Sequence, residues 1–177
     1  MFVYIGAFLL ALLIACSEKA PEHSAALTVE TLKNAEYQSE WPAGGAAKLT
    51  DGIYREKYME GAASELVIAL ILDVPAFGDL DDDGVEDAAV ILATSGGGSG
   101  TFISLEAVIN DKGAPNHAAT VLLGDRVHVK SVAVESGEIT VNMVTHGPDD
   151  PLCCPTIEVT HKYKLSGDTL VQISCRD

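Results

Sequence analysis

The feature that most limits the fold of this sequence is the regular return of turn-forming residues between short apolar segments. From residue 64 to residue 174, clusters of Gly, Asp, Asn and Ser recur about every eight to twelve residues. This spacing is typical of short antiparallel strands. The expected strands span residues 35–39, 64–73, 88–94, 101–110, 117–123, 126–134, 138–145, 156–165 and 169–174. We therefore predict a mainly β fold, an antiparallel β-sandwich or a barrel-like meander with at most one or two short helices.

Local patterns add detail to this prediction. Residues 138–145 and 156–165 alternate between apolar and polar side chains, as strands with one buried face do. The pair Asp51-Gly52 between apolar segments predicts a β-hairpin. Residues 28–33 could form a single helical turn with Thr28 as its N-cap.

The N-terminus begins with an uncharged apolar run, residues 1–15, followed by Cys16. Such a run is shorter than a membrane-spanning helix and is typical of the apolar part of a secretory signal. Residues 13–16, Leu-Ile-Ala-Cys, resemble the bacterial lipobox, which implies cleavage before Cys16 and lipid on its sulfur. An uncleaved anchor is the alternative, because no Lys or Arg precedes the run. We expect a lipoprotein signal peptide at residues 1–15, a lipidated cysteine with a flexible tether at 16–33, and one β-rich domain at 34–177.

The net charge of the chain limits the classes of partner that it is expected to bind. The formal net charge is −15, which argues against binding to nucleic acid and against electrostatic docking on anionic lipid. Attachment to the membrane is expected only through the N-terminal lipid. In a Gram-negative cell, Ser17 after the lipobox cysteine implies anchoring in the outer membrane, facing the periplasm. The sequence indicates no particular protein partner or small ligand.

An acidic stretch holds six carboxylates within residues 79–87. Like charges this close repel unless water or a cation separates them. Counted from Asp79, the spacing matches a calcium loop with carboxylates at positions 1, 3, 5 and 9, glycine at position 6 and a backbone carbonyl at position 7. The expected calcium ligands are the side chains of Asp79, Asp81, Asp83 and Asp87 and the carbonyl of Val85.

This stretch departs from an EF-hand, because position 12 is Val90 rather than Glu. It resembles the shorter D-x-D-x-D-G-x-x-D loops of FG-GAP-type β-rich proteins, and that resemblance implies the same five ligands. Asp82 stands where those loops usually have glycine. The alternative is a solvated acidic turn without a specific ion. We expect a structural calcium ion.

A second group of residues carries softer donors. His146, Cys153, Cys154 and Cys175 could form a copper(I) or zinc site, although no C-x-x-C spacing supports one. In an oxidising compartment a disulfide is the alternative, either between Cys175 and one of the adjacent cysteines or between the adjacent pair itself. With Cys16 lipidated, three cysteines remain, so one is left over.

No catalytic motif accompanies these sites. The glycine-rich residues 95–100 lack the Lys-Ser/Thr pair of a phosphate-binding loop and the final glycine of a nucleophile elbow. They are expected to connect two strands. Whether the protein is an enzyme stays open, and a non-catalytic role is favoured.

Several short motifs follow one another in order along the chain. They are GDLD at 78–81, GVEDAA at 84–89, GGGSGTF at 96–102, LLGDR at 122–126 and GPDDP at 147–151. Together they resemble a family of uncharacterised bacterial lipoproteins, some of which carry the same module ahead of a META (HslJ-like) domain. The resemblance covers residues 34–173 and implies an exported β-rich domain. Our leading hypothesis is a non-catalytic, lipid-anchored envelope protein with a structural calcium loop. The alternative is a thiol-dependent metal-handling or redox lipoprotein that uses Cys153 and Cys154.

Overall fold

The computed structural model describes residues 25–58, 60–61 and 63–176. Its elements in chain order are α1 (Val29–Lys33), β1 (Glu36–Gln38), β2 (Ala46–Lys48), β3 (Ile53–Lys57), β4 (Glu65–Gly78), β5 (Asp87–Ser95), β6 (Phe102–Asp111), β7 (Ala114–Asp125), β8 (His128–Glu135), β9 (Glu138–Thr145), β10 (Ile157–Ser166) and β11 (Thr169–Arg176). Within the described residues, no helix has the length and apolarity that crossing a bilayer requires.

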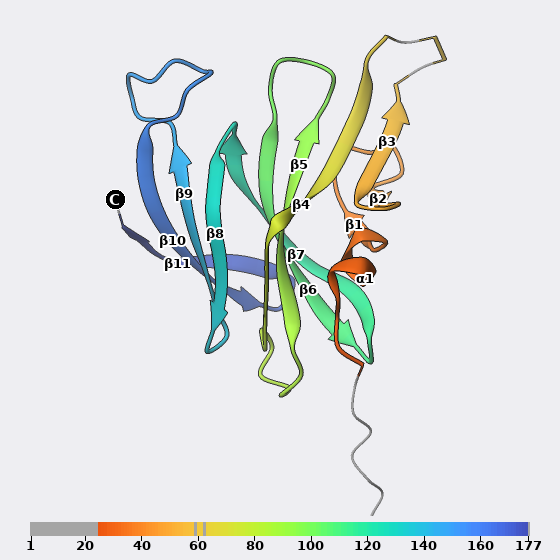
Figure 1. Ribbon diagram of the computed structural model, residues 1–177, viewed down its shortest axis with the longest axis vertical. Coiled ribbons are helices and arrows are strands. Elements are labelled where there is room, and N and C mark those ends of the chain that lie inside the picture. Colours follow the sequence, from red (N-terminus) through yellow and green to blue (C-terminus); the bar gives the residue numbers. More distant parts are fainter. Residues whose placement is uncertain (1–24, 59, 62, 177) are drawn as a thin grey trace, which may run out of the picture.

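Two antiparallel sheets form the body of the domain (Figure 1). The larger sheet has the order β3-β4-β5-β6-β7, and the smaller has the order β11-β10-β9-β8. A third sheet consists only of β1 and β2. All strand pairs are antiparallel, and the sheets do not close on themselves. The predicted mainly β, antiparallel sandwich is confirmed, and the barrel alternative is wrong.

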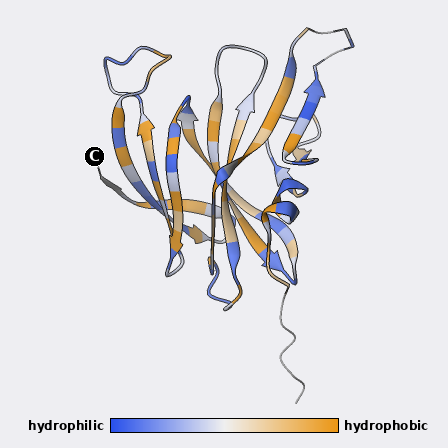
Figure 2. Ribbon diagram, viewed as in Figure 1, coloured by the Kyte–Doolittle hydropathy of each residue, from blue (hydrophilic) through white to orange (hydrophobic). Residues whose placement is uncertain are grey.

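One hydrophobic core lies between the two large sheets. The alternation predicted for residues 138–145 places Ile139, Val141 and Met143 in this core, each at most 1% exposed. Leu105 and Ile91 meet them from the larger sheet. Hydrophobic and hydrophilic residues alternate along β8, β9 and β10 in Figure 2, as expected for strands with one face buried.

A second core covers part of the outer face of the larger sheet. It is built by α1, by the small β1-β2 sheet and by apolar residues such as Leu66 and Ile68 of β4. Thr28 caps α1 as predicted, with its hydroxyl accepting from the Thr31 amide.

Leu27 and Leu32 are buried in this second core. Residues 25–33 therefore belong to the domain, and the expected tether boundary at residue 33 is corrected. The reason is that the apolar side chains at 27 and 32 cover sheet surface that would otherwise face water.

The expected hairpin at Asp51-Gly52 forms only as its turn: Thr50 and Ile53 pair across it, and the pairing extends no further into the flanking strands. Asp51 and Gly52 have positive φ, 51° and 84°, as a type I′ turn requires. However, β2 pairs with β1, whereas β3 pairs with β4. The long apolar strand β4 has a free edge that β3 fills, and this pairing replaces the expected one between the segments on either side of the turn.

Strand β4 changes direction at an irregularity. Ile71 pairs with Ile91 and Ala76 pairs with Ala89, so residues 72–75 of β4 stand opposite Val90 alone. Extra residues of this kind bend a strand. Beyond the bend, Gly78 packs closely on β8, since a Cβ there would lie 2.6 Å from Val134 Cγ1. The acidic stretch begins directly after this contact.

Candidate functional site

The acidic loop connects the end of β4 at Gly78 to the start of β5 at Asp87, as the sequence predicted. Two of its residues have left-handed backbone conformations, with φ of 65° at Asp82 and 84° at Gly84. Glycine suits such a conformation, and aspartate at position 82 is tolerated because it enters that region more readily than most residues.

Asp87 is the anchor of the loop and is only 1% exposed. One carboxylate oxygen accepts from the Leu80 amide at 2.8 Å and the other from the Asn110 amide at 2.9 Å. Burial raises the pKa of Asp87 above its ordinary value, the two backbone donors oppose this rise, and the charges of Asp81 and Asp83 add to it. Asp87 therefore holds the loop against β6 at an electrostatic cost.

Asp79, Asp81 and Asp87 each offer a carboxylate oxygen, and these oxygens lie within 4.8 Å of one another. Calcium binds oxygen at 2.3–2.6 Å, so two ligands on opposite sides of one ion lie up to about 5 Å apart. Asp79 Oδ2 accepts from the Gly84 amide at 2.8 Å. Asp79 Oδ1 is buried and has no hydrogen-bond partner among the described residues. The geometry of these three carboxylates fits a hard cation.

The fourth expected carboxylate, that of Asp83, is placed differently. Within the described chain, the close carboxylate group does not include Asp83, whose Oδ1 accepts from the Val85 amide at 2.7 Å. The amide of Val85 thus closes a short turn with Asp83. The structure brings together three of the four expected carboxylates.

The adjacent cysteines, Cys153 and Cys154, form a disulfide with each other in the loop between β9 and β10. Both residues are exposed. Of the alternatives considered from the sequence, the vicinal disulfide is the one found. Cys175 lies in β11, where its backbone pairs with His161. In this disulfide neither sulfur is a thiolate, so a soft-metal site there requires prior reduction.

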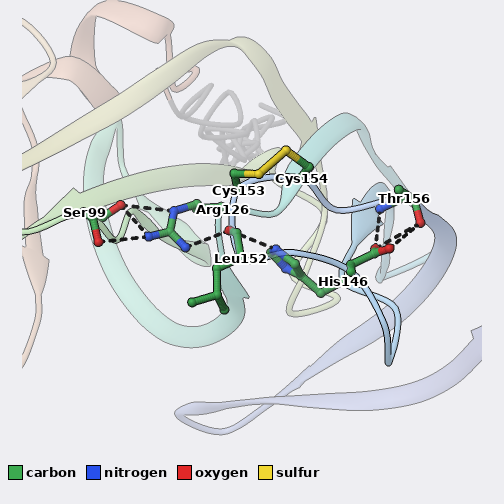
Figure 3. Close-up of a disulfide and its surroundings, with 8 residues drawn as sticks. Ser99, Arg126, His146, Leu152, Cys153, Cys154 and Thr156 are labelled. Atoms are coloured by element: carbon green, nitrogen blue, oxygen red, sulfur yellow. Dashed lines mark hydrogen bonds between the residues drawn. A yellow bond between two sulfur atoms is a disulfide. The ribbon is translucent and has the colours of Figure 1, made fainter.

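Arg126 and His146 hold the disulfide loop from two sides (Figure 3). The Leu152 carbonyl accepts from Arg126 Nη1 at 2.8 Å and lies 3.2 Å from His146 Nε2. Because a carbonyl only accepts, Nε2 of His146 carries a hydrogen in this contact. Arg126 also donates to the Ser99 carbonyl, which ties the loop to the glycine-rich connection between β5 and β6.

Asp150 closes the base of the same loop. Its Oδ2 accepts from the amides of Gly147 and Thr156, each at 2.8 Å, and its Oδ1 accepts from the Thr156 hydroxyl at 2.9 Å. The Gly147 amide first, and then Thr156, lower the pKa of Asp150 below its ordinary value, and nearby His146 acts in the same direction. The loop geometry therefore depends on an ionised Asp150.

A third group was not predicted from the sequence. Glu106 in β6 is 1% exposed and accepts from the hydroxyls of Ser104 and Thr120. His117 Nε2 lies 2.9 Å from Glu106 Oε2, and His117 Nδ1 accepts from the Gln38 amide at 3.1 Å. Strands β6 and β7 thus meet at one buried carboxylate, and His117 links it to Gln38 of β1.

A strand irregularity creates this group. In β7, Ala119 pairs with Ala107 and His117 pairs with Val108, so Ala118 is an extra residue. The extra residue puts His117 and Thr120 on the same face of the sheet, although strict alternation would separate them. The available signal was Glu106 itself, a charge within the otherwise apolar segment 105–109.

Cys16 and the expected signal peptide lie outside the described residues. No family model, no curated protein and no solved structure matches this chain.

Proposed function

We propose that this chain is a non-catalytic, lipid-anchored protein of the bacterial cell envelope whose β-sandwich is stabilised by a calcium ion in the acidic loop. The observation that carries the calcium part is the buried Asp79 Oδ1, which has no hydrogen-bond partner among the described residues and belongs to a close group of three carboxylates. A buried anionic oxygen without a partner is costly, and a cation removes that cost.

In this proposal Asp79, Asp81 and Asp87 hold the ion, and the ion supplies charge neutralisation rather than chemistry. Asp87 joins the loop to Asn110 of β6, so binding at the loop stabilises the larger sheet. Ligand binding to the folded state alone raises its stability in proportion to the logarithm of ligand concentration.

The test is thermal unfolding of the purified chain in calcium and in chelator. We expect calcium to raise the melting temperature of the wild type and Asp81→Asn to lose most of that rise. Glu86→Gln is the matched control, because Glu86 is an exposed carboxylate of the same loop outside the close group. Equal melting temperatures in calcium and chelator, or equal losses in both variants, would contradict the proposal.

The envelope location is supported by the apolar run before Cys16 and by the Cys153–Cys154 disulfide, since disulfides persist mainly in oxidising compartments. Labelled palmitate should enter the wild-type protein in a Gram-negative host and should not enter Cys16→Ala. Wild-type protein that takes up no label would contradict lipid anchoring.

A second candidate function is thiol-dependent redox or metal handling at the vicinal disulfide. It is favoured by the exposure of Cys153 and Cys154 and by His146 in the same loop. Trypsin cleavage after Lys130 and Lys162 isolates both cysteines on one peptide without Cys175. In this candidate, that peptide is lighter by two hydrogen atoms before reduction, and the reduced protein binds copper(I) or zinc. A reduced protein that binds neither metal and is not reoxidised by a disulfide donor would exclude it.

A further inference from the structure

A cavity of about 610 Å³ lies on the outer face of the larger sheet, next to the turn between β1 and β2. Its floor comes from β5, β6 and β7, and one wall comes from residues 38–45. The cavity exists because the small β1-β2 sheet and α1 cover only part of this face. Its volume is within the range of small-molecule binding sites, about 300–1,000 Å³.

Glu106 is at the floor of this cavity and is almost fully buried. Its carboxylate accepts from Ser104, Thr120 and His117. A buried charge usually has a charged partner as well as hydrogen bonds. Among the described residues, no Lys or Arg forms an ion pair with Glu106.

His117 does not supply the missing positive charge. The backbone amide of Gln38 can only donate, so His117 Nδ1 accepts and carries no hydrogen. The ring hydrogen is therefore on Nε2, where it faces Glu106 Oε2. A second ring hydrogen on Nδ1 would point at the Gln38 amide, so the observed contacts leave no place for it.

The remaining lining determines which ligands fit. In the described part of the chain, the titratable side chains that line the cavity are Glu106 and Glu40, both acidic. Leu92 and Leu122 contribute apolar surface, and Leu122 is 60% exposed there. A negative floor beside the apolar surface of two leucines favours a cation that carries an apolar group and disfavours an anion.

We infer that this cavity is a binding site for a small organic amine, whose protonated nitrogen pairs with the Glu106 carboxylate while its apolar part lies against Leu92 and Leu122. Ser104 and Thr120 fix the carboxylate from the sides. His117 is a positioning residue, because it orients Glu106 from behind and does not line the cavity. The acidic loop and the disulfide take no part in this site.

The test compares benzylamine, benzyl alcohol and benzoate, which differ mainly in the group that would meet Glu106. Trp41 is the single tryptophan of the chain; it follows Glu40 and lies 4.9 Å from the Phe102 ring, centroid to centroid. Its fluorescence and titration calorimetry on the purified full chain both report binding. We expect benzylamine to bind at least about tenfold more tightly than the alcohol, and benzoate not to bind.

Glu106→Gln keeps the shape of the side chain and removes its charge. This variant should bind benzylamine at least about tenfold more weakly and benzyl alcohol as before. The matched control is Glu135→Gln, an exposed carboxylate on β8 of the other sheet, which should change neither affinity.

Leu122→Lys tests the site without changing Glu106. It places an ammonium group at the cavity wall on an exposed position, and it should compete with benzylamine while the protein stays folded. If Glu106→Gln does not fold, benzylamine binding by Leu122→Lys tests the inference instead. Equal affinity for amine and alcohol, unchanged amine binding in a folded Glu106→Gln or in Leu122→Lys, or no saturable amine binding up to about 10 mM would overturn the inference.

Discussion

Asp87 should be the most important residue of the acidic loop for stability even when no calcium is present. Replacing it with Ala leaves two buried amides, those of Leu80 and Asn110, without acceptors. Each buried unsatisfied donor costs about 1–3 kcal/mol, so the direct loss is about 2–6 kcal/mol. The substitution also removes a buried charge that Asp81 and Asp83 repel, which offsets part of the loss. We expect a net loss of about 2–4 kcal/mol.

The comparison variant is Asp81→Ala. Asp81 is exposed and, among the described residues, accepts only from the Asp83 amide, at 3.2 Å. In chelator the substitution should therefore cost less than about 1 kcal/mol. Urea unfolding followed by circular dichroism and by Trp41 fluorescence measures both variants, with equal slopes required for the comparison. At about 2–4 °C per kcal/mol, Asp87→Ala should also melt about 4–16 °C below the wild type.

The reasoning would be refuted if Asp87→Ala in chelator were within about 1 kcal/mol of the wild type. It would also be refuted if Asp87→Ala were no less stable than Asp81→Ala. Either result would mean that water satisfies the amides of Leu80 and Asn110, so that the loop is not anchored by its last carboxylate.

Two further predictions concern other parts of the fold. Gly78→Ala should lower the free energy of unfolding by about 1–3 kcal/mol, because its Cβ would overlap Val134, whereas Gly98→Ala, with open space around it, should be nearly neutral in the same urea assay. For the disulfide loop, hydrogen bonds lower the pKa of Asp150, so its stabilising contribution is present above its ordinary value of 3.8 and is lost only as the pH falls below that value. An NMR titration of the Gly147 amide should have its midpoint below 3.8, and a midpoint at or above 3.8 would contradict the assigned contacts.

Local features were predictable from the sequence because their causes lie within a few residues. The turn at Asp51-Gly52 and the helix cap at Thr28 depend on backbone conformations that particular residues favour. The alternation of Ile139, Val141 and Met143 depends on the two-residue period of a strand. The acidic loop was predictable for the same reason, because the spacing of its carboxylates is contained in nine residues between two apolar strands.

The choice of strand partners was decided by tertiary structure. The Asp-Gly turn formed, but β3 paired with β4 because a long strand with a free edge offered more hydrogen bonds than the expected partner. Sequence likewise left three disulfides open among Cys153, Cys154 and Cys175, and the structure has the vicinal one.

By itself, the sequence determined that this chain forms an antiparallel β fold and carries carboxylates at calcium-loop spacing. Only the tertiary structure decided which carboxylates gather and which charge is buried in a cavity. Asp79, Asp81 and Asp87 meet because β4 ends beside the start of β5. Glu106 meets His117 because an extra residue in β7 turns the imidazole toward it. Strand register and bulges arise from contacts across the sheets, and short sequence patterns do not record them.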